Sequence, residues 1–215
     1  MTITYPRTDI MAYCGYQPDA VPLRLQSRQE ISRTASGVTI GKDLGPAIWM
    51  GEFVTQPLAL DDMVDFEAIL NSLDGVVRQF EAGDLRRPYP KAHPTGSFNE
   101  TAYLSAVQAG GGAIKINGTD IGFTVSRGDY LAFDYPDGRR ALHQAMETVT
   151  SVSGGETSYF EVRPRLIMPS VALSPSITVR FKNPTGLFCL VPGSVQSQMT
   201  GGEHGVVRFQ AVQSF

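Results

Sequence analysis

Charged side chains are scarce in this sequence. Asp, Glu, Lys and Arg together make up 18% of its 215 residues, and the formal net charge is −3. A nucleic-acid-binding domain carries a clustered basic excess, which this chain lacks. No block of like charges occurs either, so neither a polybasic arm nor a solvated charged tail is predicted. The charge content therefore argues against recognition of nucleic acid.

Long apolar runs and cysteines are also few. The N-terminal stretch "MTITYPRTDIMAYCGY" contains no apolar segment of signal-peptide length, and no run reaches the roughly 18 apolar residues that a membrane helix requires. Cys14 and Cys189 lie far apart, and a secreted disulfide scaffold would have more cysteines. We expect a soluble protein from a reducing compartment, with reduced and buried or half-buried thiols and no membrane insertion.

Motifs for catalysis and cofactor binding are missing as well. Gly41-Lys42 is followed by Asp43, where a P-loop needs Ser or Thr, and no G-x-S-x-G elbow occurs. Gly110-Gly111-Gly112 lacks the spaced third glycine of a dinucleotide-binding loop. Glu203-His204 has no second histidine one helical turn later, as a zinc helix would. We expect no enzyme activity, no cofactor and no metal.

Glycine and proline are abundant, with 22 and 14 residues, which predicts many turns and short strands. Strands are expected at 23–33, 38–40, 47–54 and 76–82. One helix is expected at 58–75, with its first-turn carboxylates explained by the helix dipole and Gly75 as a C-terminal cap. Five apolar residues fall on one arc of that helix, which therefore packs on a sheet: Met63, Phe66, Ile69, Leu70 and Leu73.

A proline-rich passage, 83–96, marks a boundary or an extended arm because three prolines in seven residues continue neither a helix nor a central strand. A meander of short strands follows, including 113–116, 130–134 and 139–152, joined by Gly-rich turns. This pattern suits a small barrel or an OB-like sandwich. Further alternating strands are expected within 177–215.

The stretch "SRGDYLAF" contains Arg127-Gly128-Asp129, the tripeptide of many adhesion ligands. It stands where a turn ends and an alternating strand begins. Glycine allows a tight backbone there, and the aspartate can bond the local backbone. We favour a turn over an adhesion ligand.

The order of these parts resembles the distal tail proteins of long-tailed bacteriophages and of related prophage or gene-transfer-agent tails. The resemblance covers about residues 25–215 and rests on "VRQFEA", "GGGAIKING", "VSRGDYLAF", "EVRPRL" and "NPTGLFCL". These are family-like patterns and not catalytic signatures. Residues 1–24, which contain Pro6, Pro18 and Pro22, depart from the family pattern and read as an extended arm.

The resemblance implies a mainly β protein: an antiparallel β-sandwich with one packed helix, formed by 1–94 with 174–215, and an inserted small OB-like β-barrel, 95–173, carried outward. It implies a homo-oligomeric ring, usually hexameric, that joins the tail tube to the baseplate hub. DNA would pass through the channel without sequence recognition. The protein would be made in the bacterial host cytoplasm and end in the virion tail tip.

Buried interfaces of obligate assemblies lose charge and gain aromatics. Five aromatic residues are therefore candidate subunit contacts, although packing in the core is favoured for each: Trp49, Phe53, Tyr89, Phe181 and Phe188. An alternative function is a carbohydrate- or receptor-binding tail module that uses the inserted barrel, which exposed Tyr130, Phe133, Tyr135 and Tyr159 would favour. A third, a peptidoglycan hydrolase, requires an acid pair or a histidine site that the sequence does not indicate.

Overall fold

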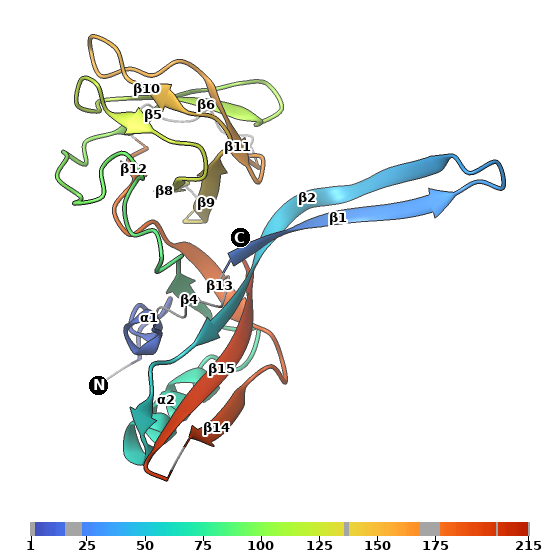
Figure 1. Ribbon diagram of the computed structural model, residues 1–215, viewed down its shortest axis with the longest axis vertical. Helices are drawn as coiled ribbons and strands as arrows, with labels where there is room; N and C mark the ends of the chain where they lie inside the picture. Colours follow the sequence, from blue (N-terminus) through green and yellow to red (C-terminus); the bar gives the residue numbers. More distant parts are fainter. Residues whose placement is uncertain (1–2, 16–22, 136–137, 168–176, 201, 215) are drawn as a thin grey trace.

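The computed structural model describes residues 3–15, 23–135, 138–167, 177–200 and 202–214. Within these ranges the protein is mainly antiparallel β, as the sequence predicts, and it has two helices where one was expected. Figure 1 shows a body built from the two ends of the chain, a barrel-like unit above it, and a hairpin that projects sideways. The predicted extended arm at 1–24 and the terminal Phe215 lie partly or wholly outside the described residues.

The body is a seven-stranded sheet centred on β15 (His204–Gln213). One edge of β15 pairs with β2 and β3, and the other with β14 and β13. The strand order is β1-β2-β15-β13-β4, with β14 and β3 beside β15. The remaining strands of this sheet are β1 (Leu23–Arg33), β2 (Thr39–Val54), β3 (Leu58–Ala59), β4 (Gln79–Ala82), β13 (Gly186–Leu190) and β14 (Gln196–Thr200).

The main helix, α2 (Leu60–Asn71), packs on one face of this sheet. Its predicted stripe is buried apart from the half-buried Ile69, and Phe66 lies 6.0 Å from Phe209 of β15 between ring centroids. The helix is shorter than predicted because residues 58 and 59 pair with β15 as β3. Gly75 has a positive φ, +65°, but it is not the cap of α2: the helix ends at Asn71 with Ser72 as its C-cap, and Gly75 lies in the turn that follows. A short helix, α1 (Ile10–Tyr13), contacts α2 and β4.

The upper unit is a six-stranded sheet in the order β12-β8-β9-β11-β6-β5, and a bridge between Tyr103 and Thr178 nearly closes it into a barrel. Its strands are β12 (Val179–Arg180), β8 (Tyr130–Asp134), β9 (Arg140–Ala145), β11 (Phe160–Arg163), β6 (Ala113–Asn117) and β5 (Tyr103–Val107). The predicted long strand 139–152 is two strands, because β9 pairs with β8, whereas β10 (Val149–Thr150) pairs with β7 (Thr124–Val125).

The barrel extends beyond the predicted boundaries of the insertion. Val179 of β12 pairs with Phe133 of β8, and Phe181 is buried in the barrel core. The chain therefore returns to the body after Phe181 and not at residue 174. At the other boundary, the ring of His93 stacks on Phe123 of the barrel at 4.6 Å, so the proline-rich passage already packs on the barrel.

The β8–β9 hairpin belongs to both cores. Tyr130, Ala132 and Leu142 lie in the core of the body, whereas the alternate residues, such as Leu131 and Phe133, lie in the core of the barrel. The expectation of a barrel carried outward on a separate body therefore needs correction. One hairpin is buried on both faces, because successive side chains of a strand point to opposite sides.

Candidate functional site

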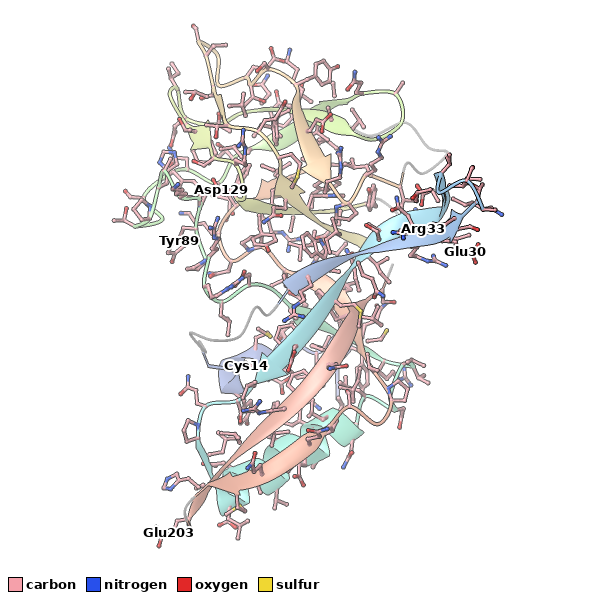
Figure 2. All side chains as sticks on the ribbon, turned by 45° about the vertical axis from the view of Figure 1, so that its right-hand side comes forward. Cys14, Glu30, Arg33, Tyr89, Asp129 and Glu203 are labelled. Atoms are coloured by element: carbon pink, nitrogen blue, oxygen red, sulfur yellow. The ribbon has the colours of Figure 1, made fainter. Side chains whose placement is uncertain are left out.

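The most unusual feature of the structure is the outer part of the β1–β2 hairpin. Every residue from 26 to 44 is exposed, and we call this segment the ribbon. Its strands rise by about 3.3 Å per residue, so it extends about 25 Å from the sheet. Figure 2 shows Glu30 and Arg33 on it, away from the packed body. The ribbon contains 19 consecutive exposed residues, and none of them belongs to either core of this protomer.

The sequence explains where the ribbon leaves the sheet. The register between β1 and β2 shifts on either side of Arg28, opposite Gly45. Such bulges bend a strand and increase its twist. Pro46 follows, and a proline is tolerated here because β2 at this point has β1 on one side and an open edge on the other. The predicted strands 38–40 and 47–54 are therefore one continuous bent strand, 39–54.

Both faces of the ribbon carry exposed aliphatic side chains. Ile31 is 73% exposed, and it pairs with Gly41; Ile40 is 55% exposed, and it pairs with Ser32. Since paired residues share a face and neighbours along a strand alternate, Ile31 and Ile40 lie on opposite faces. Leu44, at the register shift, and Val38, at the tip, are exposed as well. A hairpin that lay on its own body would keep apolar residues on one face only.

The edges of the ribbon are open too. Among the described residues β1 pairs with β2 alone, and β15 does not reach the outer part of β2, because their pairing covers Met50–Val54. Two rows of backbone N–H and C=O groups are therefore available for pairing. Proteins normally protect such edges, since an exposed edge invites association with another strand.

Most of the predicted subunit-contact aromatics lie elsewhere. Trp49 and Phe53 are 2% exposed, Phe181 1% and Phe188 0%, so these four side chains fill the cores of the protomer and are not available to a neighbour. Tyr89 is half-buried at the surface. Trp49 instead joins the two units: its Nε1–H donates to the Leu142 carbonyl at 2.9 Å. Nothing in the sequence apart from its mixed polar pattern indicates the ribbon.

The Arg127-Gly128-Asp129 segment is a turn, as favoured from the sequence. Gly128 has a φ of +92°, and Asp129 is 1% exposed. The Asp129 carboxylate accepts hydrogen bonds from the backbone N–H of Lys91 at 2.9 Å and of Ser126 at 2.7 Å. A carboxylate used in this way cannot reach an adhesion receptor. The turn interpretation is therefore confirmed.

The histidines do not converge. His93 accepts a hydrogen bond from the Thr124 N–H at Nε2, His143 is buried in the barrel, and His204 is exposed at the start of β15. Cys14 and Cys189 are both buried and free. Within the described ranges no three metal-ligating side chains come together, and neither helix has the length and hydropathy of a membrane-spanning segment.

Of the four barrel aromatics that would have favoured a glycan face, Tyr130, Phe133 and Tyr135 are buried, and only Tyr159, 50% exposed, lies open. Comparison with known proteins adds no assignment: no protein-family model matches the chain, and no curated protein matches it either.

Proposed function

We propose that this protein is a structural subunit that assembles with copies of itself through the ribbon, as a ring at the tip of a phage-like tail. The observation that carries the proposal is a 19-residue hairpin segment exposed on both faces, with open edges and aliphatic side chains. An isolated two-stranded hairpin is marginally stable in water. A neighbouring subunit would cover the ribbon and stabilise it.

A contact between neighbouring subunits of a ring fits a protomer with one projecting ribbon. In a cyclic ring of more than two subunits, each copy uses one surface to bind a different surface of the next copy. The ribbon is one such surface. The body offers exposed aliphatic residues for the other, on and after α2: Leu60, Val64, Val76 and Val77, which are 53–68% exposed. The low charge content of the chain is consistent with much surface becoming buried in an assembly.

The tail-tip setting rests on the sequence resemblance, together with the mainly β fold. In this proposal the ring links the tail tube to the baseplate hub and leaves a channel through which DNA passes without sequence recognition. The protein does no chemistry itself, and its neighbours are tube and hub proteins. A hexamer is the expected ring size.

The test is the mass and shape of the purified chain at several concentrations, by light scattering and negative-stain microscopy. The wild type should assemble into closed rings with a central hole as the concentration rises. Substituting Ile31→Lys together with Ile40→Lys places a charge on each face of the ribbon and should weaken assembly at least tenfold. Ile121→Lys is the matched control, because Ile121 is 75% exposed on a barrel turn.

The outcomes separate the parts of the proposal. A wild type that stays monomeric throughout, with the double variant indistinguishable from it, contradicts assembly through the ribbon. Dimers or open filaments that the double variant dissolves contradict the ring but keep the ribbon as the contact. Loss of assembly in Ile121→Lys to the same extent would mean that added charge, and not the ribbon, is responsible.

A further inference from the structure

A second surface, on the other side of the molecule from the ribbon, has a different chemistry. Two shallow hollows of about 350 and 630 Å³ lie where the proline-rich passage crosses the barrel, and they share Lys91. Figure 2 shows Tyr89 and Asp129 on this side, opposite Glu30 and Arg33 of the ribbon. We call the joined hollows the groove, with Arg87, Tyr89, Lys91 and Arg127 as its defining residues.

Backbone carbonyls, and not acids, position the two arginines of the groove. Arg87 donates from Nη1 to the Gly128 carbonyl at 3.2 Å, and Arg127 donates from Nε to the Met146 carbonyl at 3.1 Å. In the described part of the chain no carboxylate pairs with Arg87, Lys91 or Arg127. The remaining N–H groups of the two arginines are oriented in advance, and the exposed Lys91 adds a third positive charge, which favours charge-assisted hydrogen bonds to an anion.

The buried turn beneath the groove fixes its shape. The two carboxylate oxygens of Asp129 accept hydrogen bonds from the backbone N–H of Lys91, on the proline-rich passage, and from that of Ser126, on the barrel. The backbone N–H of Arg127 donates to the Thr148 hydroxyl at 3.0 Å. Two segments distant in sequence are thereby locked side by side. Little side-chain and loop ordering would have to accompany binding, which lowers its entropic cost.

Apolar rings line the rest of the groove. Tyr89 packs its ring against Gly96, where a Cβ would come within 2.8 Å of ring atom Cε1. Pro88, Pro90 and Pro94 form the neighbouring wall. A flat, anchored aromatic face beside prolines presents C–H and π surfaces with a rim of cations. Sites with mostly apolar walls and a few oriented polar groups are typical of small-molecule and chain-like ligands.

From this arrangement we infer that the groove binds an acidic polysaccharide, a chain of sugar rings that carry carboxylates. The ring faces would lie on Tyr89 and the prolines, and the carboxylates would meet Arg87, Lys91 and Arg127. An open groove spanning two hollows suits an extended polymer better than a small enclosed ligand. The inference goes beyond the ring proposed above and does not depend on it.

Nucleic acid fits the groove less well. Affinity for a phosphate backbone grows with the number of phosphates neutralised, and binders show a broad basic footprint. This groove offers three cations without acidic partners, on a chain of net charge −3. The groove offers one half-buried aromatic ring, Tyr89, whereas unstacked bases prefer rows of aromatic rings.

The experiment is a calorimetric titration of the full chain with oligogalacturonate as the acidic glycan probe. Maltooligosaccharide of equal length serves as the neutral sugar. A single-stranded oligonucleotide and polyglutamate of equal charge serve as the other anions. We expect oligogalacturonate to bind, and to bind at least tenfold more tightly than each of the three others. Equal binding of the oligonucleotide or of polyglutamate overturns the assignment to a glycan, and absence of oligogalacturonate binding overturns the site.

Variants locate the binding. Lys91→Gln and Arg127→Gln should each weaken oligogalacturonate binding about tenfold, and Tyr89→Ala should do the same, whereas Tyr89→Phe keeps the ring and should bind normally. Arg208→Gln, an exposed arginine on β15, is the matched charge control and should have no effect. Within the described residues the exposed Lys91 ammonium group makes no hydrogen bond or ion pair, so an unchanged affinity in Lys91→Gln overturns the proposal even if Arg127→Gln is unstable. Equal weakening by Arg208→Gln also overturns it.

Discussion

Two hairpins of this chain have opposite surroundings. The ribbon of β1–β2 is exposed on both faces, whereas β8–β9 is buried on both, with one face in the body and the other in the barrel. Their sequences reflect the difference: "QSRQEISR" is polar with one aliphatic residue, and "YLAFD" is almost wholly apolar. A strand with two apolar faces packs in the cores of both units and holds them together. A strand with two polar faces and scattered aliphatics reaches outside the fold.

We expect the β8–β9 hairpin to determine the stability of the protomer and the ribbon to determine its association. Contacts of β8–β9 hold the protomer together, so changes there should alter the free energy of unfolding. The ribbon contributes nothing to the protomer core, so changes there should alter self-association alone.

The largest effect is expected in the β8–β9 hairpin. Phe133 is fully buried and stacks on His143 with ring centroids 5.4 Å apart. Phe133→Ala should lower the free energy of unfolding by about 3–5 kcal/mol, because it removes apolar burial and leaves a cavity. Ile31→Ala on the ribbon should change it by less than about 0.5 kcal/mol. Urea unfolding at a concentration where both are monomeric measures this, and equal losses would contradict the division.

The second effect is a pH dependence that arises in the same hairpin. Burial lowers the pKa of His143 to about 4, although its Nδ1 lies 2.8 Å from the Pro164 carbonyl. The unfolded chain takes up this proton near pH 6.5 while the folded chain does not. The stabilisation is therefore complete above pH 6.5 and is lost as the pH falls toward 4, by on the order of 3 kcal/mol.

Carboxylates also titrate in this range, so the measurement is a difference. The unfolding free energy of the wild type is compared with that of His143→Leu at each pH from 7 to 4. The wild type should lose more stability on acidification, whatever the offset between the two at pH 7. Parallel curves would show that His143 takes up its proton equally in both states.

A third effect concerns the ionic contacts between the two units. Arg140 of β9 contacts Glu81 of β4 and Asp134 of β8, each at 2.6 Å. Arg140→Leu should cost about 1–2 kcal/mol, because Glu81 is partly buried and loses its partner. The control, Arg163→Leu, removes a pair with Glu161 on the same strand and should cost less than about 0.5 kcal/mol. Denaturation at low and high salt measures both, and identical losses would place the network at the surface.

The smallest effect is one of reactivity and not of stability. Burial raises the pKa of the Cys14 thiol to about 12, so it stays protonated and shielded at pH 8. In a Cys189→Ala background, labelling by a disulfide reagent should be slow in the folded protein and fast in urea. Gln29→Cys on the ribbon should label at the rate of a free thiol in both conditions. Rapid labelling of folded Cys14 would show that α1 does not shield it.

Much of the fold could be predicted from the spacing of apolar residues and from the positions of glycine and proline. The alternation of Val207, Phe209 and Ala211 predicted a half-buried strand, and the 3.6-residue stripe predicted the helix, because each pattern follows from local backbone geometry. The ends of the helices and strands were harder to predict. Residues 58 and 59 were assigned to the helix, but pairing with β15 takes them into β3. Such pairing is set by a strand nearly 150 residues away, which no local pattern reports.

The candidate sites were less predictable than the fold. Aromatic composition pointed to Trp49, Phe53, Phe181 and Phe188 as possible contacts, but burial uses all four inside the protomer. A large apolar side chain has the same sequence signature in a core and in an interface. The groove is hidden for another reason: Lys91 and Arg127 are 36 positions apart and come together only when the proline-rich passage packs on the barrel, where Asp129 bonds the backbone of Lys91 and of Ser126.

The β class, the buried stripe of α2 and the turn at Arg127-Gly128-Asp129 follow from local sequence, because each depends on residues within one turn or one strand of each other. Tertiary structure alone decided that β8–β9 serves two cores, that the barrel continues to Phe181, and that the ribbon meets neither. Strand pairing joins segments that are remote along the chain, so which face of a strand is covered depends on partners that the strand does not encode.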